Sequence, residues 1–345
     1  MTGSDALDRL LTSSRVMLVI GPGGVGKTTV AAALGCRAVA EHGRRVLVVT
    51  IDPARRLAQA LGLEELPAEP VLVPVGEGTG RLWASVVDMA RSWDELVRQL
   101  ASPADADALL VNPLYRTLTT GFIQSHDYIA LDQLATLDAD DRYDLIIVDT
   151  PPATHAIDVL DAPQAMVDFF GSRLLRWLTA PYRSRLAQTT SKPFLAVAER
   201  LLGGPFVARL AEFFWLFSRL QPGFVARADR VTRRLQQPST GYVVVTTSDP
   251  SSVTETGDLL DELDARGHDA SLVVHNRAVP IAGDEPIDLD AIADPSLRAA
   301  MAALVGRDAR LVRTLAGRSR AAEVATVPWR SGQISSVPAL IALLD

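Results

Sequence analysis

The sequence from residue 21 to residue 29 reads Gly21-Pro22-Gly23-Gly24-Val25-Gly26-Lys27-Thr28-Thr29. The apolar run before it, residues 15–20 (RVMLVI), predicts a short buried strand. The alanine-rich stretch after it, residues 28–40, predicts a helix. A strand–loop–helix unit with the pattern Gly-x4-Gly-Lys-Thr is typical of a phosphate-binding loop. Its glycines let backbone N–H groups turn toward an anion at a helix N-terminus, whose dipole favours negative charge.

We expect all nine residues of this loop to contact a nucleotide. Lys27 would reach the β- and γ-phosphates, and the Thr28 hydroxyl would bind Mg²⁺. The alternative is a chance glycine-rich turn ahead of a helix. Only two of the 34 basic residues are lysines, Lys27 and Lys192. A chain that uses arginine elsewhere has lysine where a compact, flexible cation is needed, which favours the phosphate-binding loop.

The composition limits the class of protein. The chain has 345 residues, of which 48% are hydrophobic and 22% charged, as in a folded globular protein. Its net charge of −7 argues against a general nucleic-acid partner. The single cysteine, Cys36, excludes an internal disulfide, and we expect a buried filler rather than a reactive thiol. No signal peptide or apolar 18-residue stretch is found, which predicts a cytoplasmic protein with at most peripheral membrane contact.

Apolar runs rich in β-branched residues recur between helical stretches, such as residues 251–266 and 296–316. The predicted strands cover residues 15–20, 45–51, 82–88, 144–150, 241–247, 271–276 and 323–329. This alternation predicts an α/β fold with a doubly wound, mostly parallel sheet.

Two helical stretches interrupt the alternation. We expect a nucleotide-binding core of residues 1–88, 140–161 and 238–345, and a helical insertion subdomain of residues 89–139 and 162–237. Eight of the nine phenylalanines lie in the second stretch.

Residues 208–220 (ARLAEFFWLFSRL) are the most apolar part of the insertion. Three interpretations remain open: packing in the subdomain core, a groove for a hydrophobic protein or lipid client, and attachment to a membrane surface. The side chains of a groove would be Phe213, Phe214, Trp215 and Phe217.

Two carboxylates follow predicted strands, where ligands of open α/β sheets bind. Asp149 follows the run LIIV, the Walker-B setting of a carboxylate that binds Mg²⁺. Asp52 is the candidate that orients the attacking water and accepts its proton. The alternative makes Asp52 only the N-cap of the next helix, with Pro53 at its first position.

Three segments in this order, GPGGVGKTT, TIDPARRLAQAL (50–61) and VDTPPATHAIDVL (148–160), resemble the ArsA family of ATPases. This family includes arsenite-pump and tail-anchored-protein targeting ATPases, and the chain is most similar to an actinobacterial subgroup. The resemblance implies a dimer that binds ATP with Mg²⁺ and has Asp52 in its first switch. It makes residues 149–155, including His155, the second switch. It also implies that Asn276 recognises adenine and that Pro328 packs on the base.

Pro22 departs from the family pattern, which has a lysine here that reaches the partner's nucleotide. Such a cation is worth about 10³–10⁵ in rate, so a homodimer of this chain should hydrolyse ATP slowly. Arg55 or Arg56 would be substitutes, unless both are solvated residues at a helix start. The other solution is a heterodimer with a lysine-containing paralogue.

Some sequence features of other family members are missing from this chain, and this argues against several of their functions. One cysteine cannot form the cluster of arsenite-activated members, nor a zinc clasp between subunits. The last residues form no basic amphipathic helix. We expect an ATPase that couples its nucleotide state to the helical subdomain. One rival is a poorly hydrolysing regulatory subunit of a heterodimer, and another is a small-molecule kinase, which the switch-like segments disfavour.

Overall fold

The computed structural model describes residues 3–52, 55–76, 78–121, 123–151, 158–173, 175–176, 179, 200, 203–279, 288–318, 323–330, 332 and 334–344. The chain forms two compact units. The first comprises Met1–Val87, Leu137–Ile157 and Gln236–Asp345, and the second comprises Asp88–Thr136 and Asp158–Leu235.

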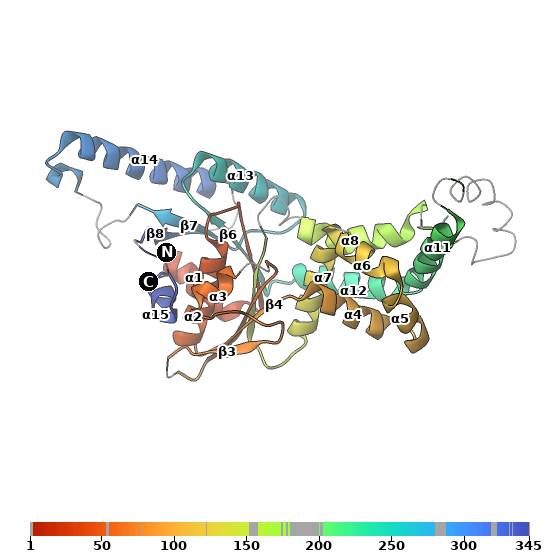
Figure 1. Cartoon of the computed structure of the whole chain (residues 1–345). Coiled ribbons are helices and arrows are strands. Elements are labelled where there is room, and N and C mark those ends of the chain that lie inside the picture. Colours follow the sequence, from red (N-terminus) through yellow and green to blue (C-terminus); the bar gives the residue numbers. More distant parts are fainter. Residues whose placement is uncertain are drawn as a thin grey trace. The chain divides into compact units, whose positions relative to one another are not determined.

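The first unit contains one sheet of eight strands in the order β3-β4-β2-β5-β1-β6-β7-β8 (Figure 1). The strands are β1 (Val16–Ile20), β2 (Arg45–Thr50), β3 (Val71–Val73), β4 (Arg81–Val86), β5 (Leu145–Asp149), β6 (Thr240–Thr246), β7 (Leu272–Ala278) and β8 (Glu323–Pro328). All neighbours pair in parallel except β3 and β4, which are antiparallel. The predicted α/β fold with a mostly parallel sheet is confirmed.

Helices cover both faces of this sheet, so every residue of β1, β5 and β6 is buried. The helices are α1 (Gly3–Ser13), α2 (Lys27–Ala40), α3 (Arg56–Ala60), α13 (Pro250–Ala265), α14 (Pro295–Arg318) and α15 (Val337–Ile341), with a 3-10 turn, η1 (Leu289–Ala291). Figure 1 shows α13 and α14 on one side of the sheet and α1, α2 and α3 on the other.

Helix α2 packs closely against the sheet, because its sequence offers small side chains. A Cβ atom on Gly35 would lie 2.6 Å from Cγ2 of Val48, so only glycine fits at this contact. The neighbouring Cys36 is fully buried, and burial raises the pKa of its thiol to about 12. The prediction of a buried, unreactive cysteine is confirmed.

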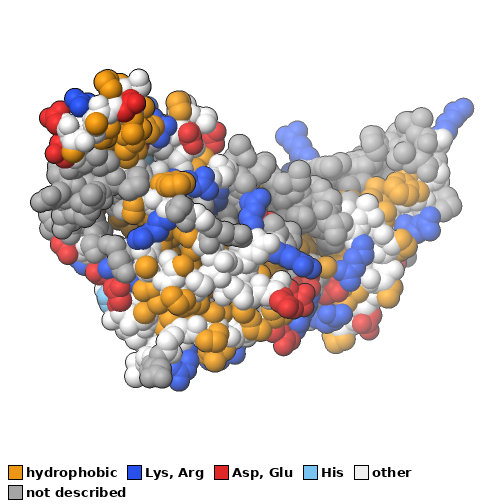
Figure 2. Space-filling view, turned by 60° about the vertical axis from the view of Figure 1, so that its left-hand side comes forward, with side chains coloured by type: hydrophobic (Ala, Val, Ile, Leu, Met, Phe, Trp, Pro, Cys, Tyr) orange, Lys and Arg blue, Asp and Glu red, His pale blue; other side chains and the backbone are white. Residues whose placement is uncertain are grey.

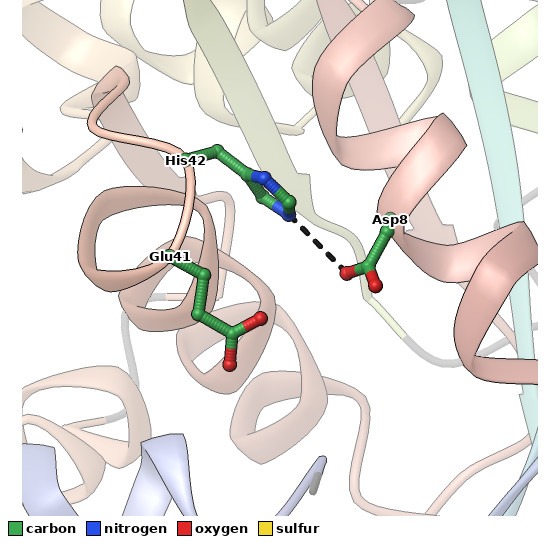
Figure 3. A group of neighbouring side chains, drawn as sticks. All are labelled: Asp8, Glu41 and His42. Atoms are coloured by element: carbon green, nitrogen blue, oxygen red, sulfur yellow. Dashed lines mark hydrogen bonds and ion pairs between the residues drawn. The ribbon is translucent and has the colours of Figure 1, made fainter.

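One buried arginine bonds to residues at several helix ends on the α1 and α2 side of the sheet. Arg37 of α2 forms ion pairs with Asp8 of α1 at 3.2 Å and with Glu41 at 2.9 Å, and it donates to the carbonyl of Leu344. His42 also lies 3.2 Å from Asp8, so two carboxylates and an imidazole converge here (Figure 3). The guanidinium already balances this group, which we interpret as a structural ion-pair network.

Helix α1 and strand β3 are among the elements of this unit that have no counterpart in the predicted pattern. Helix α1 was not predicted because its turns are polar and acidic, and β3 was not predicted because it has only three residues. The third predicted strand (82–88) ends at Val86, because the side chain of Asp88 accepts the N–H of Arg91 and caps helix α4 (Met89–Leu100).

The second unit is helical. Its helices are α4 (Met89–Leu100), α5 (Pro103–Leu110), α6 (Pro113–Gly121), α7 (Ile123–Asp138), α8 (Asp158–Gly171), α11 (Gly204–Ser218) and α12 (Gln221–Leu235). None of the described helices is both long and apolar enough to cross a membrane.

An aromatic cluster forms the core of the second unit. Phe217 stacks on Phe213 and on Phe170, with ring centroids 5.6 and 5.3 Å apart. Of the four side chains proposed for a groove, Phe213 and Phe217 are buried in this core, and Phe214 and Trp215 pack against it. The described residues of 208–220 therefore follow the core-packing interpretation.

Candidate active site

The glycine-rich loop joins the end of β1 to the start of α2, as predicted. Inside it, the Lys27 ammonium donates hydrogen bonds to the carbonyls of Gly21 at 3.0 Å and Pro22 at 2.8 Å. Burial lowers the pKa of Lys27 to about 8, although the carboxylates of Asp149 and Asp52 partly oppose this effect. The loop thus holds a cation at its centre with little contact to water.

Gly26 closes the loop in a conformation that requires glycine. Its φ of 95° lies in the left-handed region, and a Cβ atom would come within 2.4 Å of Nδ2 of Asn276. That amide group donates to the carbonyl of Val25 at 2.7 Å. Asn276, from β7, therefore fixes the shape of the phosphate-binding loop by a hydrogen bond between segments 251 positions apart.

Asp149 ends β5 directly beside the loop and is 1% exposed. Its Oδ2 atom accepts a hydrogen bond from Thr50 at 3.0 Å, whereas its Oδ1 atom is buried without a hydrogen-bond partner. Burial raises the pKa of this carboxyl to about 6, and the hydroxyls of Thr28 and Thr50 limit the rise. A buried carboxylate oxygen without a donor, beside a threonine hydroxyl, is a donor set that fits Mg²⁺.

Asp52 lies after β2, at the entry to the predicted first switch. Its side chain is half-buried, and its Oδ2 atom lies 3.5 Å from Nη1 of Arg56, four residues on. The Arg56 side chain is 66% exposed. Helix α3 begins at Arg56 with Arg55 as its N-cap. The N-cap role considered for Asp52 is therefore wrong.

One pocket of about 600 Å³ lies at the carboxyl ends of the parallel strands, beside the loop and Asp52. It is lined by Gly24, Gly26, Lys27, Thr28, Thr29, Asp52, Arg56, Gln59, Ala60, Thr150, Asn276, Arg277, Pro328, Trp329, Arg330, Gly332, Ile334 and Leu343. Among these side chains four are cationic and only one is a carboxylate, so the pocket favours an anionic ligand.

Strands β7 and β8 form another part of the pocket wall. Asn276 and Pro328, which were predicted to lie at a base, both line it. Trp329 lines it as well, with 55% of its surface exposed and its backbone N–H donated to Ala278 at 2.7 Å. Arg277 has a φ of 57°, and it is the one non-glycine residue with positive φ in the described ranges. Such a conformation costs on the order of 1 kcal/mol.

Most predicted site residues thus come together. The lining includes Gly24, Gly26, Lys27, Thr28, Thr29, Asp52, Asn276 and Pro328, but not Gly21, Pro22, Gly23, Val25 or Asp149. Gly21, Pro22 and Val25 are buried and contribute carbonyl groups, whereas Gly23 is exposed. Pro53 and residues 152–157, with His155 of the predicted second switch, lie outside the described residues.

The pocket residues that sequence reasoning missed include Arg277, Trp329 and Arg330. Arg277 and Trp329 directly follow the predicted residues Asn276 and Pro328, and Arg330 lies one position further on. The signal available was a tryptophan placed directly after Pro328 at the end of an otherwise aliphatic strand.

Comparison with known proteins gives the family. The profile of the anion-transporting ATPases matches residues 14–290. An uncharacterised protein of Streptomyces coelicolor is 34% identical over 193 residues, which cover 55% of this chain and 45% of that protein. ATPase BagA of Mycobacterium tuberculosis is 29% identical over 172 residues, 46% of this chain and 48% of BagA.

A protein of Halobacterium salinarum, provisionally named as an arsenical pump-driving ATPase, is 28% identical over 178 residues. These cover 47% of this chain and 26% of that protein. The matched part thus spans about half the length of these relatives, or less. Because the family profile covers most of the chain, including the loop and both strand ends that carry Asp52 and Asp149, this protein belongs to the ArsA family of anion-transporting ATPases.

Proposed function

We propose that this protein binds ATP with Mg²⁺ in the cytoplasm, hydrolyses it to ADP and phosphate, and couples the nucleotide state to the helical unit. The observation that carries the proposal is the pocket itself. It brings the Lys27 ammonium, the Thr28 hydroxyl and the Asp52 carboxylate to one cavity, in which four of the five charged lining side chains are cations.

Each residue has a role in this reaction. Lys27 would leave the loop carbonyls to bind the β- and γ-phosphates, an exchange of one set of oxygen acceptors for another. Thr28 and Asp149 would hold Mg²⁺, which would neutralise part of the negative charge of the phosphates. Asp52 would orient a water molecule toward the γ-phosphorus and accept its proton.

The base end of the pocket supports a nucleotide rather than a simple anion. Pro328 and the exposed face of Trp329 offer apolar surface to a purine, and Asn276 offers an amide. Among the described residues on the face shown in Figure 2, basic side chains are interspersed with acidic and apolar ones and form no continuous basic patch. This distribution supports a small nucleotide rather than a nucleic acid as the ligand.

The test uses the purified chain and the two lysines of the sequence. ATP affinity is measured by titration calorimetry, and ADP and phosphate are measured under single-turnover conditions. Lys27→Ala should weaken ATP binding at least ~100-fold, because the phosphates lose a buried charged partner. Lys192→Ala is the matched control and should bind ATP as the wild type does. Equal affinity of both variants, or transfer of phosphate to a third molecule, would overturn the proposal.

Pro22 favours a second candidate, a nucleotide-binding regulatory subunit. Proline has no charge to offer a partner's nucleotide, and Pro22 is buried with its carbonyl bound to Lys27. Under this proposal the chain pairs with a lysine-containing paralogue, and a second copy is the alternative partner. Single-turnover hydrolysis with and without the paralogue separates the two, because full turnover by the isolated chain would exclude the heterodimer.

A hydrophobic protein or lipid client of the helical unit is a further proposal. It rests on the exposed Phe206 of α11, which is 38% exposed, and not on the buried Phe213 and Phe217. Photo-crosslinking from position 206 in the presence of ATP or ADP tests this proposal. A crosslinked product that forms equally with both nucleotides would count against coupling between the nucleotide state and client binding.

A further inference from the structure

Strands β7 and β8 lose their register at the pocket. His275 pairs with Thr326 and Ala278 pairs with Pro328, so two residues of β7 oppose a single residue of β8. The two residues of β7 at this point are Asn276 and Arg277, one more than β8 has there. A bulge of this kind re-aims side chains at a sheet end, and here it brings both residues to the pocket wall.

The bulge is held in an unfavourable backbone conformation. Arg277 adopts a φ of 57°, and its N–H bonds to Oδ1 of Asn276 at 3.0 Å. A strained residue persists where its surroundings determine its conformation. The contacts that flank Asn276 and Arg277 are therefore the place to look for what holds them.

Both flanks of the bulge connect to one carboxylate, Asp308 of α14. Its Oδ2 atom accepts the N–H of Val279 at 2.7 Å, on the far side of the bulge. Its Oδ1 atom accepts the hydroxyl of Ser248 at 2.5 Å, and the Ser248 oxygen lies 2.7 Å from Nε2 of His275, on the near side.

The direction of these hydrogen bonds follows from the donors available. Ser248 has one hydroxyl proton and gives it to Asp308, so the Nε2–H of His275 donates to the Ser248 oxygen. His275 is 1% exposed and Ser248 is 4% exposed. Water therefore has little access to replace these bonds if one is lost. The carboxylate also lies 3.6 Å from Nε of Arg307 on its own helix.

We propose that Asp308 is a positioning residue of the nucleotide pocket, whose carboxylate fixes the β7 bulge so that Asn276 faces the adenine base. This inference rests on the proposed binding of ATP. Asp308 does not line the pocket, so it acts through Asn276 and not on the ligand. Helix α14 thereby becomes part of the machinery that selects the base.

The experiment measures the ratio of ATP affinity to GTP affinity by titration calorimetry with the full chain and Mg²⁺. Asn276→Ala should lower this ratio at least ~10-fold, because the site loses the group that reads the base. Asp308→Ala should lower it by a similar factor, with much less effect on the affinity for inorganic tripolyphosphate. In the double variant the two losses should not add, because Asp308 acts through Asn276.

Two further variants separate positioning from other effects. Asp308→Asn should keep the ratio within ~3-fold of wild type, since its amide accepts from Val279 and donates to Ser248. Leu311→Ala truncates a buried side chain of the same helix and leaves the hydrogen bonds of Asp308 in place, so it should leave the ratio unchanged. If Asp308→Ala fails to fold, Ser248→Ala removes the near-side link alone and should still lower the ratio.

The outcomes are distinct. A wild-type protein that binds neither nucleotide would overturn the proposed function. A wild type that binds ATP and GTP equally, or an Asp308→Ala variant with an unchanged ratio, would overturn the positioning role alone. An equal loss in Leu311→Ala would also overturn it, because the effect would then come from general loosening of α14.

Discussion

Replacing Asp149 with asparagine should stabilise the nucleotide-free protein while removing a ligand for Mg²⁺. Asp149 is 1% exposed, and its Oδ1 atom receives no hydrogen bond. Burial therefore raises the pKa of this carboxyl from 3.8 to about 6. A difference of about two pKa units corresponds to ~3 kcal/mol of unfavourable free energy for the ionised form.

The sign of the pH dependence follows from this shift. The pKa of Asp149 is higher in the folded than in the unfolded state, so the group favours folding at low pH. This stability is lost as the pH rises through about 6. The asparagine variant does not ionise, so its advantage over wild type should grow by ~2 kcal/mol between about pH 4.5 and about pH 7.5.

The assay is urea unfolding at several pH values, with EDTA and without nucleotide. Asp290→Asn, whose side chain is 97% exposed in the native protein, is the control and should show no pH-dependent gain. A gap between Asp149→Asn and wild type that stays constant with pH would refute the reasoning. An asparagine variant that is less stable at pH 7.5 would refute it as well.

Three further predictions concern the pocket. ATP affinity should fall above about pH 8 by up to ~tenfold per pH unit, because the pKa of Lys27 is lowered to about 8 and the side chain loses its proton there. An ATP affinity that calorimetry finds constant up to about pH 9.5 would contradict this prediction. Trp329→Ala should weaken ATP binding by about 1–3 kcal/mol, if stacking on a base resembles that measured for nucleic acids. Trp329→Phe should keep most of the affinity, and an equal loss for tripolyphosphate would argue against stacking. Pro22→Lys should raise the turnover of the isolated chain at least ~10-fold, and an unchanged rate in a chain that sediments as a dimer would exclude the missing lysine as the limit.

The sequence predicts the sheet well because its central strands are buried on both faces. Runs such as residues 145–148 (LIIV) and 242–245 (YVVV) are apolar throughout, which is typical of parallel strands under two layers of helices. Strand β3 gives no such signal. It is three residues long, and its place at the sheet edge depends on antiparallel pairing with β4.

The phosphate end of the site could be predicted because its residues are consecutive. The base end could be predicted only in part, from Asn276 and Pro328. The bulge that carries Asn276 depends on Asp308, a residue 32 positions further on in a separate helix. No local pattern marks such a contact, because it forms only once α14 packs on the sheet. The same holds for the hydrogen bond from Asn276 to Val25.

Strand β3 also affects whether copies of the protein can associate through the edge of the sheet. An outer strand exposes unpaired backbone groups to which another chain can add its own strand. Here Pro70 and Pro74 stand directly before and after Val71–Val73, and proline has no N–H to donate. The prolines leave an incoming strand too few donors for a stable ladder. Self-association through this edge strand is therefore disfavoured, even though Leu72 in it is 56% exposed.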